Sequence, residues 1–228
     1  MHLIHDLRIV LMVIAICLEQ LRNRFGATPL PQEVQHVGQL VETGRAILDE
    51  LLVSSELRSS MTHIDVNRLI EEIEGILREI VGPHVAVRTA LAARESRIYA
   101  RRVDLERIVL NLVFNAATAM PAGGVLTIET VSAPPEPHDL WIDPAAPYGD
   151  LRLTIGDTGR GMSECEVQKA SYPLARRPRP DGTGMGLASV ALIVTRLDGK
   201  VEISSRQDAG TLVAVTLPLA PSPGEPIH

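Results

Sequence analysis

The N-terminal part of the chain carries apolar positions at helical spacing in two stretches, residues 3–25 and roughly 32–60. Gly26, Pro29 and Pro31 separate them, which is a typical signal for a helix end followed by a turn. Residues 9–18 within the first stretch are apolar on every side, a pattern that favours the interior of a helical bundle. Because one helical hairpin would leave much of this surface in water, we expect two copies of the chain to pair as a four-helix bundle.

The pattern then changes to shorter elements that mix helix and strand. Asp65 is a candidate N-cap for a helix that ends at Gly82 and Pro83, and Asp104 is a candidate N-cap for a second helix. Helical spacing predicts helices over residues 66–81, 104–120 and 187–197, and alternation predicts strands at residues 85–91, 97–100, 125–131, 151–155, 200–205 and 211–217. Residues 133–149 are rich in proline and predict a loop.

Two asparagines stand in the predicted helix over residues 104–120. Asn111 and Asn115 are four residues apart, so they lie on one side of that helix. Asparagine favours caps and turns over helix interiors, so an aligned pair calls for a functional explanation. Asparagine side chains can coordinate a hard cation and contact phosphate. A pair of solvated surface residues is the alternative without function.

Two glycine clusters, GDTGRGM at residues 156–162 and DGTGMGL at residues 181–187, flank a basic and proline-rich span. A predicted strand leads into the first cluster and a predicted helix leaves the second, so both turns are expected at one edge of a sheet. Gly182, Gly184 and Gly186 let backbone N–H groups approach a phosphate chain closely at the start of a helix.

The first cluster suits the base of a nucleotide. Asp157 is an acceptor at the end of a strand and fits an exocyclic amine, while Gly159 and Gly161 keep side chains out of the space beside it. Either cluster alone is also explained as a tight loop. Together, in this order and with the asparagine helix, they predict a nucleotide site.

Composition narrows the class of protein. A chain of 228 residues with 45% hydrophobic residues can bury a substantial core, which excludes a disordered or fibrous class. The net charge of −6 argues against nucleic acid as a partner. Cys17 and Cys165 lack CxxC spacing, which favours a reducing, cytoplasmic setting. The apolar run at residues 9–18 is shorter than the about 20 residues that a bilayer needs, so we expect no membrane span in this chain.

The ordered set of motifs resembles the sensor histidine kinases of two-component signalling. The asparagine helix continues as NLVFNAATAMPAGG, and DTGRGM, GTGMGL and the late Gly210 and Thr211 follow. The resemblance covers essentially the whole chain and implies an α+β protein. Its parts are a helical hairpin at residues 1–62 that dimerises and carries phosphate, an ATP-binding domain of the Bergerat type at 63–220, and a disordered tail at 221–228. The implied domain is an α/β sandwich, a mixed sheet with helices on one face.

The resemblance also implies ATP and Mg²⁺ as cofactors and assigns roles to residues. Asn115 is the implied Mg²⁺ ligand with Asn111 beside it, and Asp157 reads adenine with assistance from Thr211. Related ATPases carry at the position of Asn111 a glutamate that activates water, and asparagine is no general base, which favours transfer to a side chain over hydrolysis. The other implied ATP-binding residues belong to the glycine clusters: Gly159, Gly161, Met162, Gly182, Thr183, Gly184, Met185, Gly186 and Leu187.

His5 opens the segment HDLR, which resembles the family's H-[D/E]-x-[R/N] motif and makes His5 the expected phosphoacceptor. Asp6 beside it is expected to accept a hydrogen bond from the ring, which fixes the tautomer and leaves the other nitrogen nucleophilic. An ordinary surface histidine is the alternative. Ile9 and Val10 depart from the family pattern of Thr or Asn followed by Pro, so we expect weak phosphatase activity.

The sequence therefore predicts a cytoplasmic, homodimeric histidine kinase core that binds Mg²⁺-ATP, autophosphorylates on His5 and passes the phosphoryl group to an aspartate of a response-regulator receiver domain. One alternative is a non-catalytic phosphotransfer adaptor with a vestigial ATP domain. Another is an enzyme of the same fold but another class, either an ATP hydrolase or a Ser/Thr kinase of the anti-sigma type. Acid-labile phosphorylation that depends on His5 would distinguish a histidine kinase from the adaptor, the hydrolase and the Ser/Thr kinase.

Overall fold

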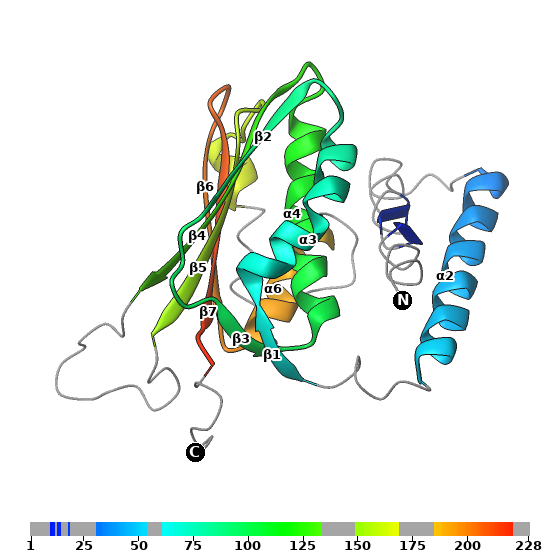
Figure 1. Cartoon of the computed structure of the whole chain (residues 1–228). Helices are drawn as coiled ribbons and strands as arrows, with labels where there is room; N and C mark the ends of the chain where they lie inside the picture. Colours follow the sequence, from blue (N-terminus) through cyan, green and yellow to red (C-terminus); the bar gives the residue numbers. More distant parts are fainter. Residues whose placement is uncertain are drawn as a thin grey trace. The chain divides into compact units, whose positions relative to one another are not determined.

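The structure is a computed structural model that describes residues 10, 11, 13, 14, 18, 31–53, 61–133, 149–168 and 185–220, with the backbone alone at 42, 45–53, 133, 185 and 186. The chain divides into two compact units, Met1–Ser60 with Arg179–Gly186 and Met61–Pro178 with Leu187–His228. The first unit contains helix α2, Gln32–Val53 (Figure 1). The second contains a mixed sheet and the helices that cover it. His5 and Asp6 lie outside the described residues.

In the first unit, described residues before α2 pack against it in the antiparallel sense. A Cβ added to Gly44 would lie 3.3 Å from Cδ1 of Leu11, and one added to Gly38 would lie 3.9 Å from Cδ1 of Leu18. On α2, Val41 is buried, whereas Leu40 is 70% exposed. The four-helix bundle expected from the sequence stays a prediction, because only one copy of the chain is present.

The second unit is built on a sheet with the strand order β2-β4-β5-β7-β6. Strand β2 (Val85–Leu91) runs parallel to β4 (Gly124–Ala133), and the remaining neighbours are antiparallel. These are β5 (Asp150–Asp157), β7 (Gly210–Pro218) and β6 (Lys200–Arg206). The sheet is therefore mixed, and each strand predicted for this region is present within a few residues of its expected ends.

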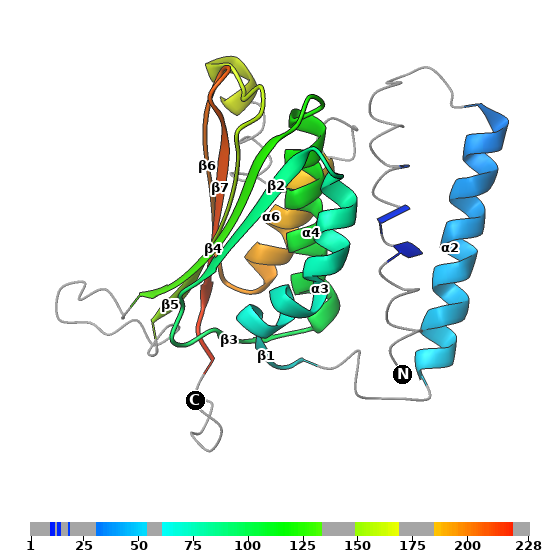
Figure 2. The same cartoon turned by 45° about the horizontal axis from the view of Figure 1, so that its top comes forward.

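Helices α3 (Val66–Val81), α4 (Arg102–Ala119) and α6 (Met185–Arg196) lie on one face of this sheet (Figures 1 and 2). The core lies between the two layers and consists of alternating strand residues and of one stripe from each helix; Leu69, Ile73, Leu110, Leu126, Ile128, Leu151 and Val190 belong to it. Strands β1 (Thr62–Asp65) and β3 (Arg97–Ala100) form a separate antiparallel pair. No helix among the described residues is long and apolar enough to cross a membrane.

The two predicted N-caps have different outcomes. Asp65 caps α3 as expected, because its Oδ1 accepts a hydrogen bond of 3.1 Å from the N–H of Arg68. The prediction for Asp104 is wrong: α4 begins at Arg102, and its N-cap is Arg101. Asp104 lies in the first turn, where its carboxylate forms an ion pair of 2.8 Å with Arg101 and interacts favourably with the helix dipole.

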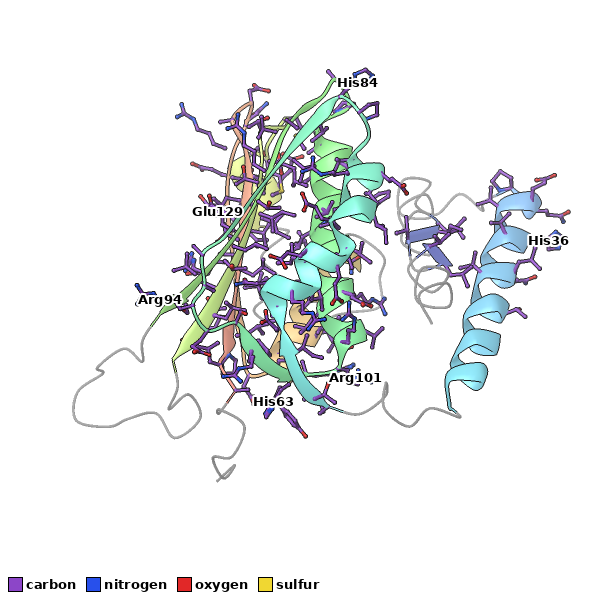
Figure 3. The ribbon with its side chains drawn as sticks, in the orientation of Figure 1. His36, His63, His84, Arg94, Arg101 and Glu129 are labelled. Carbon is purple, nitrogen blue, oxygen red and sulfur yellow. The ribbon has the colours of Figure 1, made fainter. Side chains whose placement is uncertain are left out.

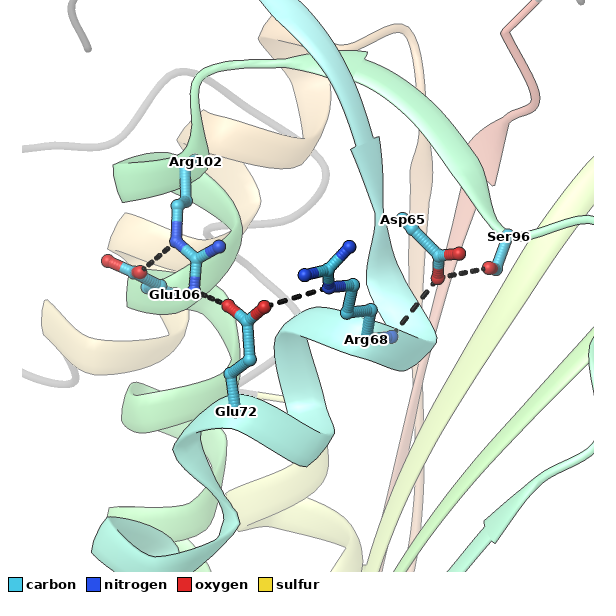
Figure 4. A network of polar contacts seen from close by, with 6 residues as sticks. All are labelled: Asp65, Arg68, Glu72, Ser96, Arg102 and Glu106. Atoms are coloured by element: carbon cyan, nitrogen blue, oxygen red, sulfur yellow. Dashed lines mark hydrogen bonds and ion pairs between the residues drawn. The ribbon is translucent and has the colours of Figure 1, made fainter.

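A network of ion pairs connects α3 with the start of α4 (Figure 4). Glu72 on α3 accepts from Arg68 at 3.0 Å and from Arg102 at 2.7 Å. Arg102 also contacts Glu106 at 2.7 Å, and the side chain of Glu106 is fully buried. A buried carboxylate requires such a partner, so the network holds the N-terminal end of the asparagine helix against α3.

Candidate nucleotide-binding site

Asp157 ends strand β5 on the face of the sheet that the helices cover. Leu151, Leu153 and Ile155 precede it at alternate positions and are buried against the helices, so the period of the strand directs Asp157 to the same side. Oδ1 of Asp157 accepts hydrogen bonds from the N–H of Gly159 at 2.8 Å and of Thr211 at 3.3 Å. Among the described residues no group donates to Oδ2, so the second oxygen is available to a ligand.

The electrostatic environment of Asp157 suits an incoming donor. Burial raises the pKa of the Asp157 carboxyl above its ordinary value of 3.8, although the N–H groups of Gly159 and Thr211 act in the opposite direction. The ionised carboxylate is therefore incompletely solvated in the protein alone. A hydrogen-bond donor placed against Oδ2 replaces the lost water, which is the property expected of a residue that reads an exocyclic amine.

The glycines after Asp157 are required by close packing of backbone against backbone. A Cβ on Gly159 would lie 2.5 Å from the carbonyl oxygen of Ala119 at the end of α4, and the N–H of Arg160 donates to the same oxygen at 3.1 Å. Gly161 has a φ of 60°, and a side chain there would meet the carbonyl oxygen of Arg206. The turn is thus clamped between the end of α4 and the β6–β7 hairpin.

Two hydroxyl residues that the sequence did not single out complete this turn. Thr158 exchanges hydrogen bonds with Val125, donating its N–H to the carbonyl at 3.2 Å and accepting with Oγ1 at 2.9 Å. Ser205 on β6 accepts with Oγ from the N–H of Met162 at 2.9 Å. Its position opposite Thr211 follows from the β6–β7 register, which no local sequence pattern reveals.

The two asparagines of α4 lie on the side of the helix that leads to the turn. Asn111 is 2% exposed, and its Nδ2 is buried without a hydrogen-bond partner among the described residues. Asn115 follows one turn later and is half-buried, and Ala119, which contacts Gly159, follows after another turn. A buried donor without a partner fits a ligand oxygen, because it is costly to leave unpaired in the protein alone.

The second glycine cluster is described only at its end. Residues 181–184, with Gly182, Thr183 and Gly184, lie outside the described residues. Helix α6 begins at Met185, so Met185, Gly186 and the half-buried Leu187 occupy its first turn. The helix expected to leave this cluster is therefore present and begins two residues before the predicted span of 187–197, whereas the role of the loop in phosphate binding stays a prediction.

A hollow of about 440 Å³ lies on the other face of the sheet. Its walls include side chains that point away from the helices, such as Thr127, Glu129 and Thr154, and Figure 3 shows Glu129 on that side. Neither asparagine contributes to its lining. Asp157, Ser205 and Thr211 also contribute to the lining, so the hollow reaches the strand ends that carry the candidate site. The alternation along β5 assigns the side chain of Asp157 to the face that the helices cover.

Comparison with known families decides the class of this domain. The model of the family described as histidine kinase-, DNA gyrase B-, and HSP90-like ATPase matches residues 100–221, more than half of the chain. The chain belongs to this ATPase family. The matched region of this family member includes both asparagines, Asp157, the glycine clusters and Thr211.

Similar curated proteins are histidine kinases. The chain is 29% identical to the histidine protein kinase DivJ of Caulobacter vibrioides over 236 aligned residues, which cover 96% of this chain and 36% of DivJ. It is 24% identical to the sensor kinase CckA of Brucella abortus, with 94% of this chain and 23% of CckA covered. The chain thus spans a minor part of these relatives, and the matches confirm its resemblance to the histidine kinases.

Solved structures of histidine kinases share the fold. The mycobacterial sensor histidine kinase MprB aligns with a TM-score of 0.54 and 23% identity over 71% of this chain and 100% of that chain. Full-length ShkA, solved in complex with AMPPNP, aligns with a TM-score of 0.51 and 22% identity over 97% of this chain and 45% of ShkA. The expected α/β ATP-binding fold with a mixed sheet is thereby confirmed.

Proposed function

We propose that this chain is the catalytic core of a histidine kinase, which binds Mg²⁺-ATP, phosphorylates itself on His5 and transfers the phosphoryl group to an aspartate of a response-regulator receiver domain. The observation that carries the proposal is the state of Asp157. One oxygen is held by two backbone N–H groups and the other faces no donor among the described residues, on the same face of the sheet as the asparagine helix.

The proposed base site uses Asp157 and Thr211. Oδ2 of Asp157 accepts from the exocyclic amine of adenine, and Thr211 lies opposite Asp157 in the β5–β7 register. Because Oδ1 is already anchored, the carboxylate is oriented before the base arrives, which lowers the cost of ordering on binding. Gly159 and Gly161 let the turn lie against α4 and the β6–β7 hairpin, so this orientation is supported from both sides.

The proposed phosphate side uses the asparagine helix and the start of α6. The buried Nδ2 of Asn111 is a donor suited to a phosphate oxygen, and the amide oxygen of Asn115 is the proposed ligand for Mg²⁺. When bound, Mg²⁺ neutralises charge on the phosphates. The loop at residues 182–187 is proposed to cover them with backbone N–H groups ahead of α6.

The proposed acceptor is His5, with Asp6 fixing its tautomer. A ring nitrogen attacks the γ-phosphorus in line, the bond to the bridging oxygen breaks, and ADP leaves with that oxygen. In the next step the phosphoryl group passes from the imidazole to a carboxylate of the receiver domain. Asn111 favours this route over hydrolysis, because an amide cannot accept a proton from water as a general base.

The proposed assembly is a homodimer in the cytoplasm, with residues 1–62 as a dimerising hairpin and residues 63–220 as the ATP-binding domain. Antiparallel packing of Leu11 and Leu18 against α2 supports a hairpin. Val37 and Leu40 on α2 are 44% and 70% exposed, and a second hairpin would cover such apolar surface. The names of the relatives, which are histidine and sensor kinases, support a receiver domain as partner.

The decisive experiment is incubation of the purified chain with γ-labelled ATP and Mg²⁺, followed by acid and base treatment. We expect label that is acid-labile and base-stable and that disappears in His5→Ala. His63→Ala is the matched control, because His63 is an exposed histidine whose ring contact is with Tyr99. Acid-stable label would indicate a Ser/Thr kinase. Release of phosphate that does not depend on His5 would indicate an ATP hydrolase. Absence of ATP binding would indicate a non-catalytic adaptor.

A further inference from the structure

Three polar side chains form a row on the covered face of the sheet. Asp157 on β5 is opposite Thr211 on β7, and Thr211 is opposite Ser205 on β6. Residues paired in this way across antiparallel strands point to the same side of a sheet. Ser205 is therefore the neighbour of Thr211 on the side away from Asp157.

The hydroxyl group of Ser205 has three contacts and one proton. It accepts from the N–H of Met162, it lies 2.9 Å from the carbonyl oxygen of Gly210, and it lies 2.9 Å from Oγ1 of Thr211. A carbonyl oxygen can only accept, so Ser205 satisfies it only by donating. All three contacts are satisfied together in one arrangement, in which Ser205 donates to Gly210 and Thr211 donates its own proton to Ser205.

This arrangement determines whether Asp157 and Thr211 present hydrogen-bond donors or acceptors to a bound base. The hydroxyl proton of Thr211 is turned away from Asp157, so Thr211 presents lone pairs to a ligand. The N–H groups of Gly159 and Thr211 are directed to Oδ1 of Asp157. Both Asp157 and Thr211 then present acceptors. An amino group at position 6 of a purine donates to acceptors, whereas a 6-oxo group is itself an acceptor and is repelled by them.

We propose that Ser205 sets the specificity of the site for 6-aminopurine over 6-oxopurine nucleotides, by accepting the hydrogen bond that the Thr211 hydroxyl donates. Ser205 touches no ligand in this proposal and acts as a positioning residue. The inference rests on the proposed nucleotide function of the site and adds to it the reason for base selection. Its signature is the ratio of two affinities, because removal of a purely structural contact weakens both nucleotides alike.

The test compares dissociation constants for Mg²⁺-ATP and Mg²⁺-ITP by titration calorimetry. The two nucleotides differ at position 6 of the base, amino in ATP and oxo in ITP, and consequently at N1, which is an acceptor in ATP and an N–H donor in ITP. In Ser205→Ala the hydroxyl of Thr211 loses its acceptor, so it can donate a hydrogen bond to the 6-oxo group instead. We expect the preference for ATP over ITP to fall about tenfold, the factor expected for one hydrogen bond. Ser204→Ala is the matched control, since Ser204 is exposed, points to the opposite face of the sheet from Ser205 and has no side-chain hydrogen bond among the described residues.

A double substitution distinguishes a loss of base specificity through Thr211 from a general loosening of the turn. With Thr211→Val in place there is no hydroxyl proton to redirect, so adding Ser205→Ala is expected to leave the ratio unchanged. Ser205→Cys keeps nearly the same volume with a weak donor and serves if the alanine variant unfolds; the same fall in the ratio is expected. An unchanged ratio in both Ser205 variants, with ATP still bound, overturns this inference alone. Failure of the unaltered chain to bind either nucleotide overturns the proposed function as well.

Discussion

The proposed base side and the proposed phosphate side of the site differ in how far their hydrogen bonds are complete within the protein. At the turn after β5, Oδ1 of Asp157 and the hydroxyls of Thr158 and Ser205 all have partners. On α4, the Nδ2 of Asn111 is buried and has none among the described residues. The protein alone therefore holds the Asp157 turn in place, whereas on the proposed phosphate side a buried donor lacks the partner that we propose a ligand oxygen provides.

The largest expected effect comes from Asp157→Asn. The Asn Oδ1 can still accept from the N–H groups of Gly159 and Thr211, which leaves the amide nitrogen, a donor, facing the amine of adenine. Affinity for Mg²⁺-ATP should fall about 100-fold, because a hydrogen bond to a charged group contributes roughly 1.5–3 kcal/mol. Calorimetry measures the loss, and a melting temperature close to that of the unaltered chain shows that the turn is intact. Affinity retained within a few-fold would remove Asp157 from the base site.

The rigidity of the base side is tested by a pair of glycine substitutions. Gly161→Ala places a Cβ at a φ of 60° against the carbonyl oxygen of Arg206 and should lower the free energy of unfolding by about 2 kcal/mol. Gly75→Ala, in the interior of α3 with nothing within 4 Å of the added Cβ, should raise it by about 0.5–1 kcal/mol. Urea denaturation measures both. Equal stability of the two variants would mean that the turn yields to the added side chain.

Asn111→Leu tests the phosphate side. Removal of a buried donor that lacks a partner should stabilise the protein without ligand by about 1 kcal/mol, because an apolar group of similar shape avoids the desolvation penalty. The same change should weaken Mg²⁺-ATP binding. Denaturation with and without Mg²⁺-ATP measures both effects on one sample. A variant that is less stable without ligand would show that the amide already serves the fold.

The smallest expected effect is a dependence of stability on pH. Because burial raises the pKa of Asp157 in the folded protein, the folded state holds this proton more tightly than the unfolded chain does. The free energy of unfolding should therefore fall, relative to Asp157→Asn, as pH rises from near the ordinary value of 3.8 through the raised pKa, and the difference should be constant above it. Denaturation of both proteins over a series of pH values provides the measurement. A difference that grows in favour of the unaltered chain would reverse the sign of the shift.

Local signals in the sequence were enough for most of the fold. The polar Asp65 before an apolar run and the Gly82 after it mark α3, and alternation marks each strand of the sheet. Asp104 shows where two local signals compete, because an aspartate near the start of a helix suits either the N-cap or the first turn. In the structure Asp104 lies in the first turn and forms an ion pair with Arg101, which is the N-cap. Asn111, Asn115 and Asp157 were singled out because their residue types are unusual where they stand, and Thr211 was singled out through the family resemblance. Their roles in ATP binding stay predictions.

The sequence by itself determined the order of elements in the sheet domain and the family, and it supplied the candidate site residues, since these depend on local spacing and composition. Only the tertiary structure decided that Ser205 lies beside Thr211, that Gly159 is required by the end of α4, and that the amide of Asn111 is buried without a partner. Each of these depends on strand register or on contact between elements distant along the chain. Such contacts follow from how the sheet and helices pack, which no short stretch of sequence records.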